Sequence, residues 1–288
     1  LLEQTDGTVS FINHKITTDG LEAQLLKQPI KLSFTGAQED KGYQANININ
    51  GDWQVTPLLK SFSDGLTKYL SGSSNWTADI ALTLPAQGYE YTAQIFSELT
   101  QLNSDLPAPF SKASAQSLPL VVTSQGNERA SSIRVTLGQD VEFNGNLPHQ
   151  DMQFSRAHLA IGQSDMIGMG LGFSVSANLL ELDVRSWYAT INTLLNDLPD
   201  NNDKTLLEAP KRIFIKADKA LFASQRLTGL EVVAKNTSDS WLFDINAKET
   251  RMEVALYKDW LNKGVDIKAD FIELTEWQDS RTGKVEAL

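Results

Sequence analysis

The 288-residue sequence predicts a mainly β protein of antiparallel strands, with two or three short amphipathic helices packed on them. Runs of alternating apolar and polar residues recur along the chain, and this period of two is typical of strands with one dry and one wet face. Short clusters of Gly, Asn, Asp and Ser separate the runs, as expected for turns. Two segments show helical periodicity instead.

The clearest strand is the stretch "GYQANININGDW", which runs from Gly42 to Trp53. Its apolar residues fall on one side, its Gln and Asn residues fall on the other, and it closes on the turn pair Gly51-Asp52. The same pattern returns in "SNWTADIALTLP", "SIRVTLG", "RIFIKAD", "WLFDINAK" and "GVDIKADFIEL". Each of these runs is therefore expected to expose one polar face and to hold the other face dry.

The first helical segment is "TPLLKSFSDGLTKYLSG", which predicts a helix over Pro57 to Leu70 with Thr56 as its N-cap. Gly65 weakens this helix at its centre. The second segment, "SWYATINTLLNDLP", predicts a helix over Trp187 to Leu198 with Ser186 as its cap. Each helix follows a strand-like run and a tryptophan, which indicates a repeated strand-then-helix module.

We expect residues 1–288 to form one continuous β-rich segment, with a candidate repeat boundary near residues 175–185. The stretch "LPAPFSKASAQSLP" is rich in Pro, Ser and Ala and predicts a loop that crosses between two runs of strands. The chain begins at Leu1 without a methionine, so we expect a piece of a longer protein with any membrane anchor outside it.

The composition argues against several classes of function. The 36 acidic and 25 basic residues give a formal charge of −11, which disfavours nucleic acid as a partner. The absence of cysteine removes disulfides, thiolate nucleophiles and cysteine-ligated metals. Every apolar run is strand-sized and falls short of the roughly 20 residues that span a bilayer.

The search for catalytic chemistry returns no specific motif. His14, His149 and His158 lack the spaced partners of a metal site, so we expect no metal and no cofactor. A carboxylate pair for glycoside hydrolysis is defined by its separation in space, and the sequence leaves that chemistry open. Most acidic residues occupy the polar side of strands, so the chain is not expected to be an enzyme.

Several segments together resemble the AsmA-like family, in its long YhdP type. They occur in order between about Gly7 and Leu274 and include "GYQANININGDWQVTPLL", "SELTQLNSDLPAPFSKA" and "SANLLELDVRSW". The order of "GDW", "LPAPFSK" and "LDVRSW" is the most specific part, whereas the final "WQDSRTGKVEAL" has no counterpart in the resemblance.

This resemblance implies an elongated, strongly curved antiparallel sheet with an apolar groove. It also implies a periplasmic location, in a protein anchored in the inner membrane by a helix outside this fragment. Family members are similar to bridge-like carriers that move phospholipid toward the outer membrane, so phospholipid and envelope or outer-membrane proteins are the expected partners.

The expected groove lining consists of apolar residues on the dry sides of five runs: Ile47, Ile49, Ile80, Leu82, Ile213, Ile215, Phe243, Ile245, Val265 and Ile267. Each lipid methylene contributes about 0.8 kcal/mol when it leaves water, so an aqueous crossing needs a continuous dry surface. Three alternatives remain at this level: burial of these side chains in a closed sandwich, a structural envelope protein without a ligand, and a carbohydrate-binding protein. The last would stack sugars on exposed tryptophans, namely Trp53, Trp76, Trp241 or Trp277.

Overall fold

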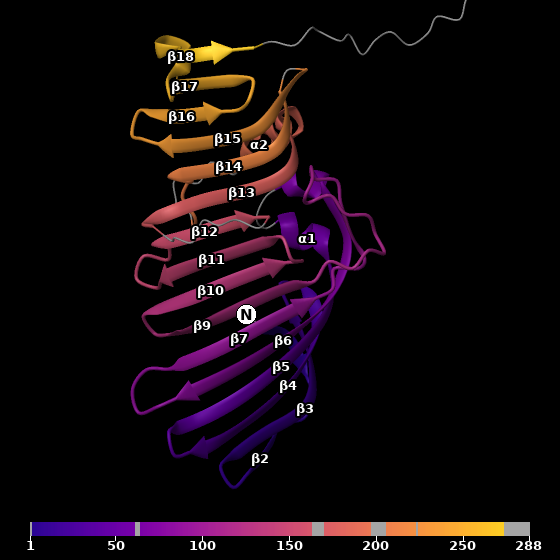
Figure 1. Cartoon of the computed structure of the whole chain (residues 1–288). Coiled ribbons are helices and arrows are strands. Elements are labelled where there is room, and N and C mark those ends of the chain that lie inside the picture. Colours follow the sequence, from indigo (N-terminus) through magenta and orange to yellow (C-terminus); the bar gives the residue numbers. More distant parts are fainter. Residues whose placement is uncertain (1, 61–63, 163–169, 197–205, 223, 274–288) are drawn as a thin grey trace, which may run out of the picture.

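The computed structural model describes residues 2–60, 64–162, 170–196, 206–222 and 224–273. These residues build a sheet of 18 strands, in which the strands follow one another like the rungs of a ladder (Figure 1). Strand β2 lies at one end of the ladder and β18 at the other (Figure 1). The predicted fold class, a mainly β chain with one large curved sheet, is confirmed.

The first half of the sheet is a series of antiparallel pairs. Both β1 and β2 pair with β3, the strands from β3 to β7 pair in sequence, and β9 follows β7, while the short β8 pairs with the start of β6. The strands are β1 (Leu2–Asp6), β2 (Ser10–Ile12), β3 (Lys15–Leu25), β4 (Gln28–Glu39), β5 (Gly42–Gln54), β6 (Leu70–Leu84), β7 (Glu90–Ser97), β8 (Leu102–Ser104) and β9 (Leu120–Asn127).

The second half continues the ladder but contains two parallel pairs. The pairs β12–β13 and β13–β14 are parallel, whereas the other neighbours from β9 to β18 are antiparallel. The strands are β10 (Ala130–Leu137), β11 (Val141–Pro148), β12 (Arg156–Ile161), β13 (Gly172–Asp183), β14 (Arg212–Phe222), β15 (Gln225–Asn236), β16 (Ser240–Asn246), β17 (Thr250–Tyr257) and β18 (Val265–Ile272).

The expectation of a wholly antiparallel assembly is therefore corrected at β13. Parallel neighbours need a crossover connection, and the one between β13 and β14 contains a helix. Residues 175–183 lie in β13, which is paired on both sides, and residues 184–185 begin α2; the repeat boundary proposed near 175–185 stays a prediction.

The predicted first helix is shorter and divided. The structure has α1 at Val55–Lys60 and a 3₁₀ helix, η1, at Asp64–Lys68, while Leu70 already belongs to β6. The α-helix starts before Thr56, so Thr56 is not its N-cap. The glycine that weakened the prediction, Gly65, lies in the 3₁₀ turn.

The predicted second helix is α2, at Val184–Asn196, and the residues beyond it fall outside the described residues. Asp183 takes the capping role expected of Ser186: its carboxylate accepts hydrogen bonds from the Ser186 backbone N–H at 3.0 Å and hydroxyl at 2.6 Å. These hydrogen bonds hold the pKa of Asp183 below its usual range. A third short helix, α3, spans Trp260–Lys263.

Helices α1 and α2 lie along the same long side of the ladder (Figure 1). α1 packs on β6, and α2 packs on β14 and η1. The larger buried cluster near α1 centres on Trp53, whose indole N–H donates to the Pro29 carbonyl oxygen at 3.0 Å. Trp76 meets Trp53 edge to face, with ring centroids 4.7 Å apart, so this end of the apolar face is firmly packed.

Candidate functional site

The structure places all ten predicted groove residues on one face of the sheet. Directly paired residues of neighbouring strands share a face, and the pairings from β5 to β18 connect the ten positions without a change of side. We call this surface the apolar face. Eight of the ten side chains are half-buried, while Val265 and Ile267 on β18 are 44% and 62% exposed.

One row of this face is apolar from end to end of the ladder. It takes one residue from every strand from β3 to β18 except β8, and successive members are directly paired. The row, which we call the apolar row, consists of Leu21, Leu32, Ile49, Ala78, Ile95, Val122, Val135, Phe143, Leu159, Val175, Ile213, Ala234, Phe243, Val254 and Ile267.

The remaining predicted residues lie in rows beside the apolar row. Ile47 and Ile80 pair with each other, and Leu82 lies one row further toward the hairpin turns. On the other flank Ile215 and Ile245 belong to a row completed by Leu120, Leu137, Val141, Ile161, Ala177, Val232, Met252 and Ala269. The apolar face is thus several rows wide.

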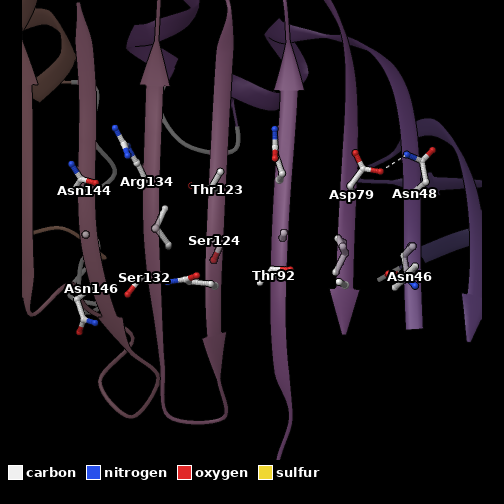
Figure 2. A pocket seen from close by; sticks show the side chains of 18 of the residues that line it. Asn46, Asn48, Asp79, Thr92, Thr123, Ser124, Ser132, Arg134, Asn144 and Asn146 are labelled. Atoms are coloured by element: carbon white, nitrogen blue, oxygen red, sulfur yellow. Dashed lines mark hydrogen bonds between the residues drawn. The ribbon is translucent and has the colours of Figure 1, made fainter. Parts of the chain in front are cut away.

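The opposite face of the same strands is polar between β4 and β12. A depression of about 1180 Å³ lies there, with amide, hydroxyl and charged side chains along it. Figure 2 shows these side chains along neighbouring strands and the hydrogen bond that Asn48 donates to Asp79 at 2.7 Å. Arg134 is paired with Glu142 at 2.9 Å, and nothing in the depression forms a set of metal ligands among the described residues.

No second sheet covers the apolar face in the part of the chain that the structure describes. All strands belong to the one ladder, so the predicted alternative of a closed sandwich does not describe these residues. The half-buried state of the predicted residues agrees with this, because side chains between two packed sheets would be fully buried.

A roof covers the apolar face over one section, between β6 and β10. Here α1 and the loop of residues 105–119 cover part of a cavity of about 600 Å³ on the sheet. Its floor includes Ile95 and Val122 of the apolar row, and its roof includes Leu58, Phe110 and Leu118. The lining is almost wholly apolar, which suits an aliphatic ligand.

Helix α2 is joined to this roof. The Trp187 indole N–H donates to the Ala108 carbonyl oxygen at 3.1 Å, and its ring meets Phe110 edge to face at 5.7 Å. The sequence predicted only a crossing loop for residues 106–119. Leu106, Phe110 and Leu118 were the available signal for a roof, but their spacing fits no regular element.

The roof contains a buried cation, Lys112, which is 5% exposed. Its ammonium donates to the carbonyl oxygens of Leu102 at 2.6 Å, Ala113 at 3.1 Å and Thr100 at 3.5 Å. Burial lowers the pKa of Lys112. Sequence reasoning missed this residue, because a single lysine in a loop gives no sign of its burial.

One cluster of polar residues on the apolar face lies near the hairpin turns. The Tyr91 hydroxyl is hydrogen-bonded to Ser124 at 2.8 Å and to Ser131 at 2.5 Å, and Ser131 is bonded to His149 Nε2 at 2.8 Å. This cluster lies outside the apolar row, whose members continue past it.

The tryptophans proposed for sugar stacking are differently placed. Trp53 is buried, at 9% exposure, and Trp76 packs against it, so both rings are used inside the protein. Trp241 is stacked on Phe243 at 6.1 Å on the apolar face, and Trp277 falls outside the described residues. Trp53 and Trp76 therefore form no exposed aromatic platform, and Trp241 is part of the apolar face.

Two of the histidines take part in hydrogen bonds with serine hydroxyls: His149, described above, and His158. His158 is buried on the polar face, where Nδ1 lies 2.7 Å from the Ser174 hydroxyl and Nε2 lies 3.0 Å from the Ser176 hydroxyl. Burial lowers the pKa of His158 despite the opposing effect of Glu142. Among the described residues no group of three or more His, Asp or Glu side chains is arranged to hold a metal ion.

The helices of the described residues are too short or too polar to cross a bilayer. A family model described as YhdP protein matches residues 1–287. The chain is 24% identical over 259 residues to the Intermembrane phospholipid transporter YhdP of Escherichia coli (strain K12), a match that covers 88% of this chain. It spans only 20% of that relative's length. No solved structure matches the chain.

Proposed function

The chain belongs to the YhdP family, and we propose that it is a periplasmic segment of an inner-membrane-anchored protein that moves phospholipid toward the outer membrane. The observation that carries this proposal is the apolar row, which crosses the ladder from β3 to β18 without a polar member. The name of the Escherichia coli relative, an intermembrane phospholipid transporter, supports the choice of cargo.

The physical basis is the burial of acyl chains during an aqueous crossing. Each methylene that contacts the apolar face instead of water contributes about 0.8 kcal/mol, and a gap in the dry surface would re-expose it. In the proposed path the chains lie on the apolar face while the headgroups remain in water at its open side. The ten predicted residues line this path, which needs no catalytic group, metal or cofactor.

The two functions without lipid transport, a structural envelope segment and a carbohydrate-binding protein, lack a comparable observation. A structural segment has no need of an exposed apolar surface, which is a liability in water. Of the tryptophans that would stack on sugars, Trp53 and Trp76 pack against each other inside the protein and Trp241 lies on the apolar face. Partner proteins in the envelope, and the anchor outside this segment, remain part of the proposal.

Mass spectrometry of the lipids that remain with the purified chain tests the proposal. We expect glycerophospholipid to be retained by the wild-type chain and to be depleted in an Ile49→Asp, Ile213→Asp double variant, which places charge in the apolar row. The matched control is an Asn50→Asp, Arg212→Asp double variant, because both residues are exposed on the opposite face and neither is directly paired with an acidic residue. Equal retention by both variants, or no lipid on a folded wild-type chain, would contradict a lipid path.

A further inference from the structure

The apolar face changes in polarity along the strands β7, β9 and β10. At one end of these strands the roof covers part of the cavity of about 600 Å³, whose lining is almost wholly apolar. At the other end, near the hairpin turns, the same face carries the hydrogen-bonded cluster that includes Tyr91, Ser131 and His149. A single strand shows the change, because Leu137 of β10 lines the cavity while Ser131 of β10 belongs to the cluster.

The distance between these two ends matches the length of one phospholipid. Leu137 and Ser131 are six positions apart on β10, which at about 3.3 Å per residue corresponds to about 20 Å. A bilayer is about 40–45 Å thick with its headgroups, so one of its two leaflets also measures about 20 Å. A phospholipid aligned with the strands therefore reaches from the cavity to the cluster.

The roofed end offers no free partner to a charged headgroup. Lys112, the charged residue of the cavity lining, donates to three backbone carbonyl oxygens, so its donors are used within the protein. The Ser97 hydroxyl, also in the lining, is hydrogen-bonded to that of Ser74 at 2.7 Å. An ionised phosphate beneath the roof would lose its water without gaining partners, which costs several kcal/mol.

The hairpin-turn end allows a headgroup to keep its water. The turn between β9 and β10 contains Glu128 and Arg129, which are both exposed. Tyr91 and His149 are half-buried, so the cluster lies at the border between the dry face and solvent. Acyl chains at this end would stay partly in water, and each methylene left there forfeits about 0.8 kcal/mol. Both ends of the face therefore favour the same orientation of a lipid.

We propose that a phospholipid in this section lies along β7, β9 and β10, with its acyl chain ends beneath the roof and its headgroup at the hairpin turns, beside the cluster of Tyr91, Ser131 and His149. This inference rests on the proposed function and adds to it the orientation of the lipid. It also assigns the edge of the ladder along which headgroups travel. A phospholipid that moves along the apolar row passes the roof with only its chains beneath it.

Two photoreactive phospholipids bound to the purified chain test this orientation. One carries a diazirine at the end of an acyl chain, the other carries it in the headgroup, and peptide mass spectrometry locates the adducts. The acyl-chain probe should label the roof loop, residues 105–119, whereas the headgroup probe should label the β9–β10 turn and His149. Each probe should favour its own end at least about tenfold, because a free-energy difference of about 1.4 kcal/mol already gives that ratio.

A charge placed beneath the roof checks that the acyl chains occupy the cavity. Leu118 lines the cavity, so Leu118→Asp should lower the labelling of the roof loop by the acyl-chain probe about tenfold. The matched control is Ser114→Asp in the same loop, because Ser114 is exposed and lies outside the cavity lining. Unchanged labelling of a folded Leu118→Asp chain would show that the chains do not lie beneath the roof.

The wild-type chain decides the orientation even where Leu118→Asp fails to fold. Labelling of the roof by the headgroup probe, or equal labelling of both ends by the two probes, would overturn the orientation and leave a lipid path in place. A folded wild-type chain that forms no adduct with either probe would overturn the proposed function together with the orientation.

Discussion

A carboxylate at Ile47 should destabilise the fold moderately, as expected for a dry face that remains open on one side. Ile47 lies between Phe34 on β4 and Ile80 on β6, and its side chain is half-buried. Full burial of an isoleucine side chain contributes about 1.5–3 kcal/mol to the free energy of unfolding. Removing the half-buried Ile47 side chain therefore loses about half of this, roughly 1 kcal/mol. Partial desolvation of the new carboxylate adds roughly 1–2 kcal/mol, because water still reaches it from the open side.

Urea unfolding of Ile47→Asp at neutral pH should therefore show a loss of roughly 2–3 kcal/mol, with the chain still folded in water. Asn46→Asp is the control, since Asn46 is exposed on the polar face and its paired neighbours, Thr35 and Ala81, are uncharged. Its effect should stay within about 0.5 kcal/mol.

The adjacent residue Asn48 also lies on the polar side of the strand, but Asn48→Asp is unsuitable as a control. Asn48 donates to the Asp79 carboxylate at 2.7 Å, so an aspartate at this position would oppose a second negative charge. Two outcomes for Ile47→Asp would refute this reasoning. A loss of unfolding free energy no larger than that of the control would indicate that the side chain is fully exposed to water. A chain that no longer folds would indicate that the side chain lies in a closed core.

Three further predictions concern the elements around the apolar face. Asp183→Ala should lower the free energy of unfolding by about 1 kcal/mol, because it removes the cap of α2. Since the pKa of Asp183 is lowered in the folded chain, this stabilisation is present above about pH 4 and is lost as the pH falls through the folded pKa. A loss that does not change with pH in urea unfolding would contradict this prediction. Because the pKa of His158 is lowered in the folded chain, the unfolded chain binds a proton at this residue more readily than the folded chain does. The free energy of unfolding should therefore fall as the pH drops below about 6.5. His158→Gln should reduce this pH dependence in the same urea measurement. Trp187→Phe removes the hydrogen bond from the indole N–H to the Ala108 carbonyl oxygen. Backbone amide hydrogen exchange in residues 105–119 should then become about three- to tenfold faster. Unchanged exchange would mean that α2 does not hold the roof in place.

The local parts of the fold could be predicted from the sequence because strand alternation reports which side chains share a face. In "GYQANININGDW" the apolar set of Ile47 and Ile49 follows from the period of two alone. Which side chains of distant strands share a face could be decided only once the register of the strand pairs was known. For example, Val175 and Ile213 meet through a parallel pairing that crosses α2, and no local pattern encodes that pairing.

The parts that escaped prediction depend on contacts outside regular periodicity. Either Asp183 or Ser186 could cap α2 by residue type, and the start of the helix decides between them. The roof over the cavity arises from an irregular loop, where Phe110 meets Trp187 of α2 and Lys112 donates to the carbonyl oxygens of Leu102 and Thr100, contacts that no sequence periodicity reports. The apolar faces of single strands were therefore accessible to sequence reasoning, whereas the roofed cavity was not.

Photo-crosslinking of chain-bound phospholipid tests the central claim most directly, because it reports contact residue by residue. A benzophenone amino acid would be placed at Ile49, Ile213 and Ile267, which sample the apolar row from β5 to β18, and at Asn50 and Lys268, which are exposed on the other face. The account predicts phospholipid adducts at all three positions of the row and none at the two controls. Equal labelling of the two faces, or labelling that stops partway along the row, would contradict a continuous lipid path.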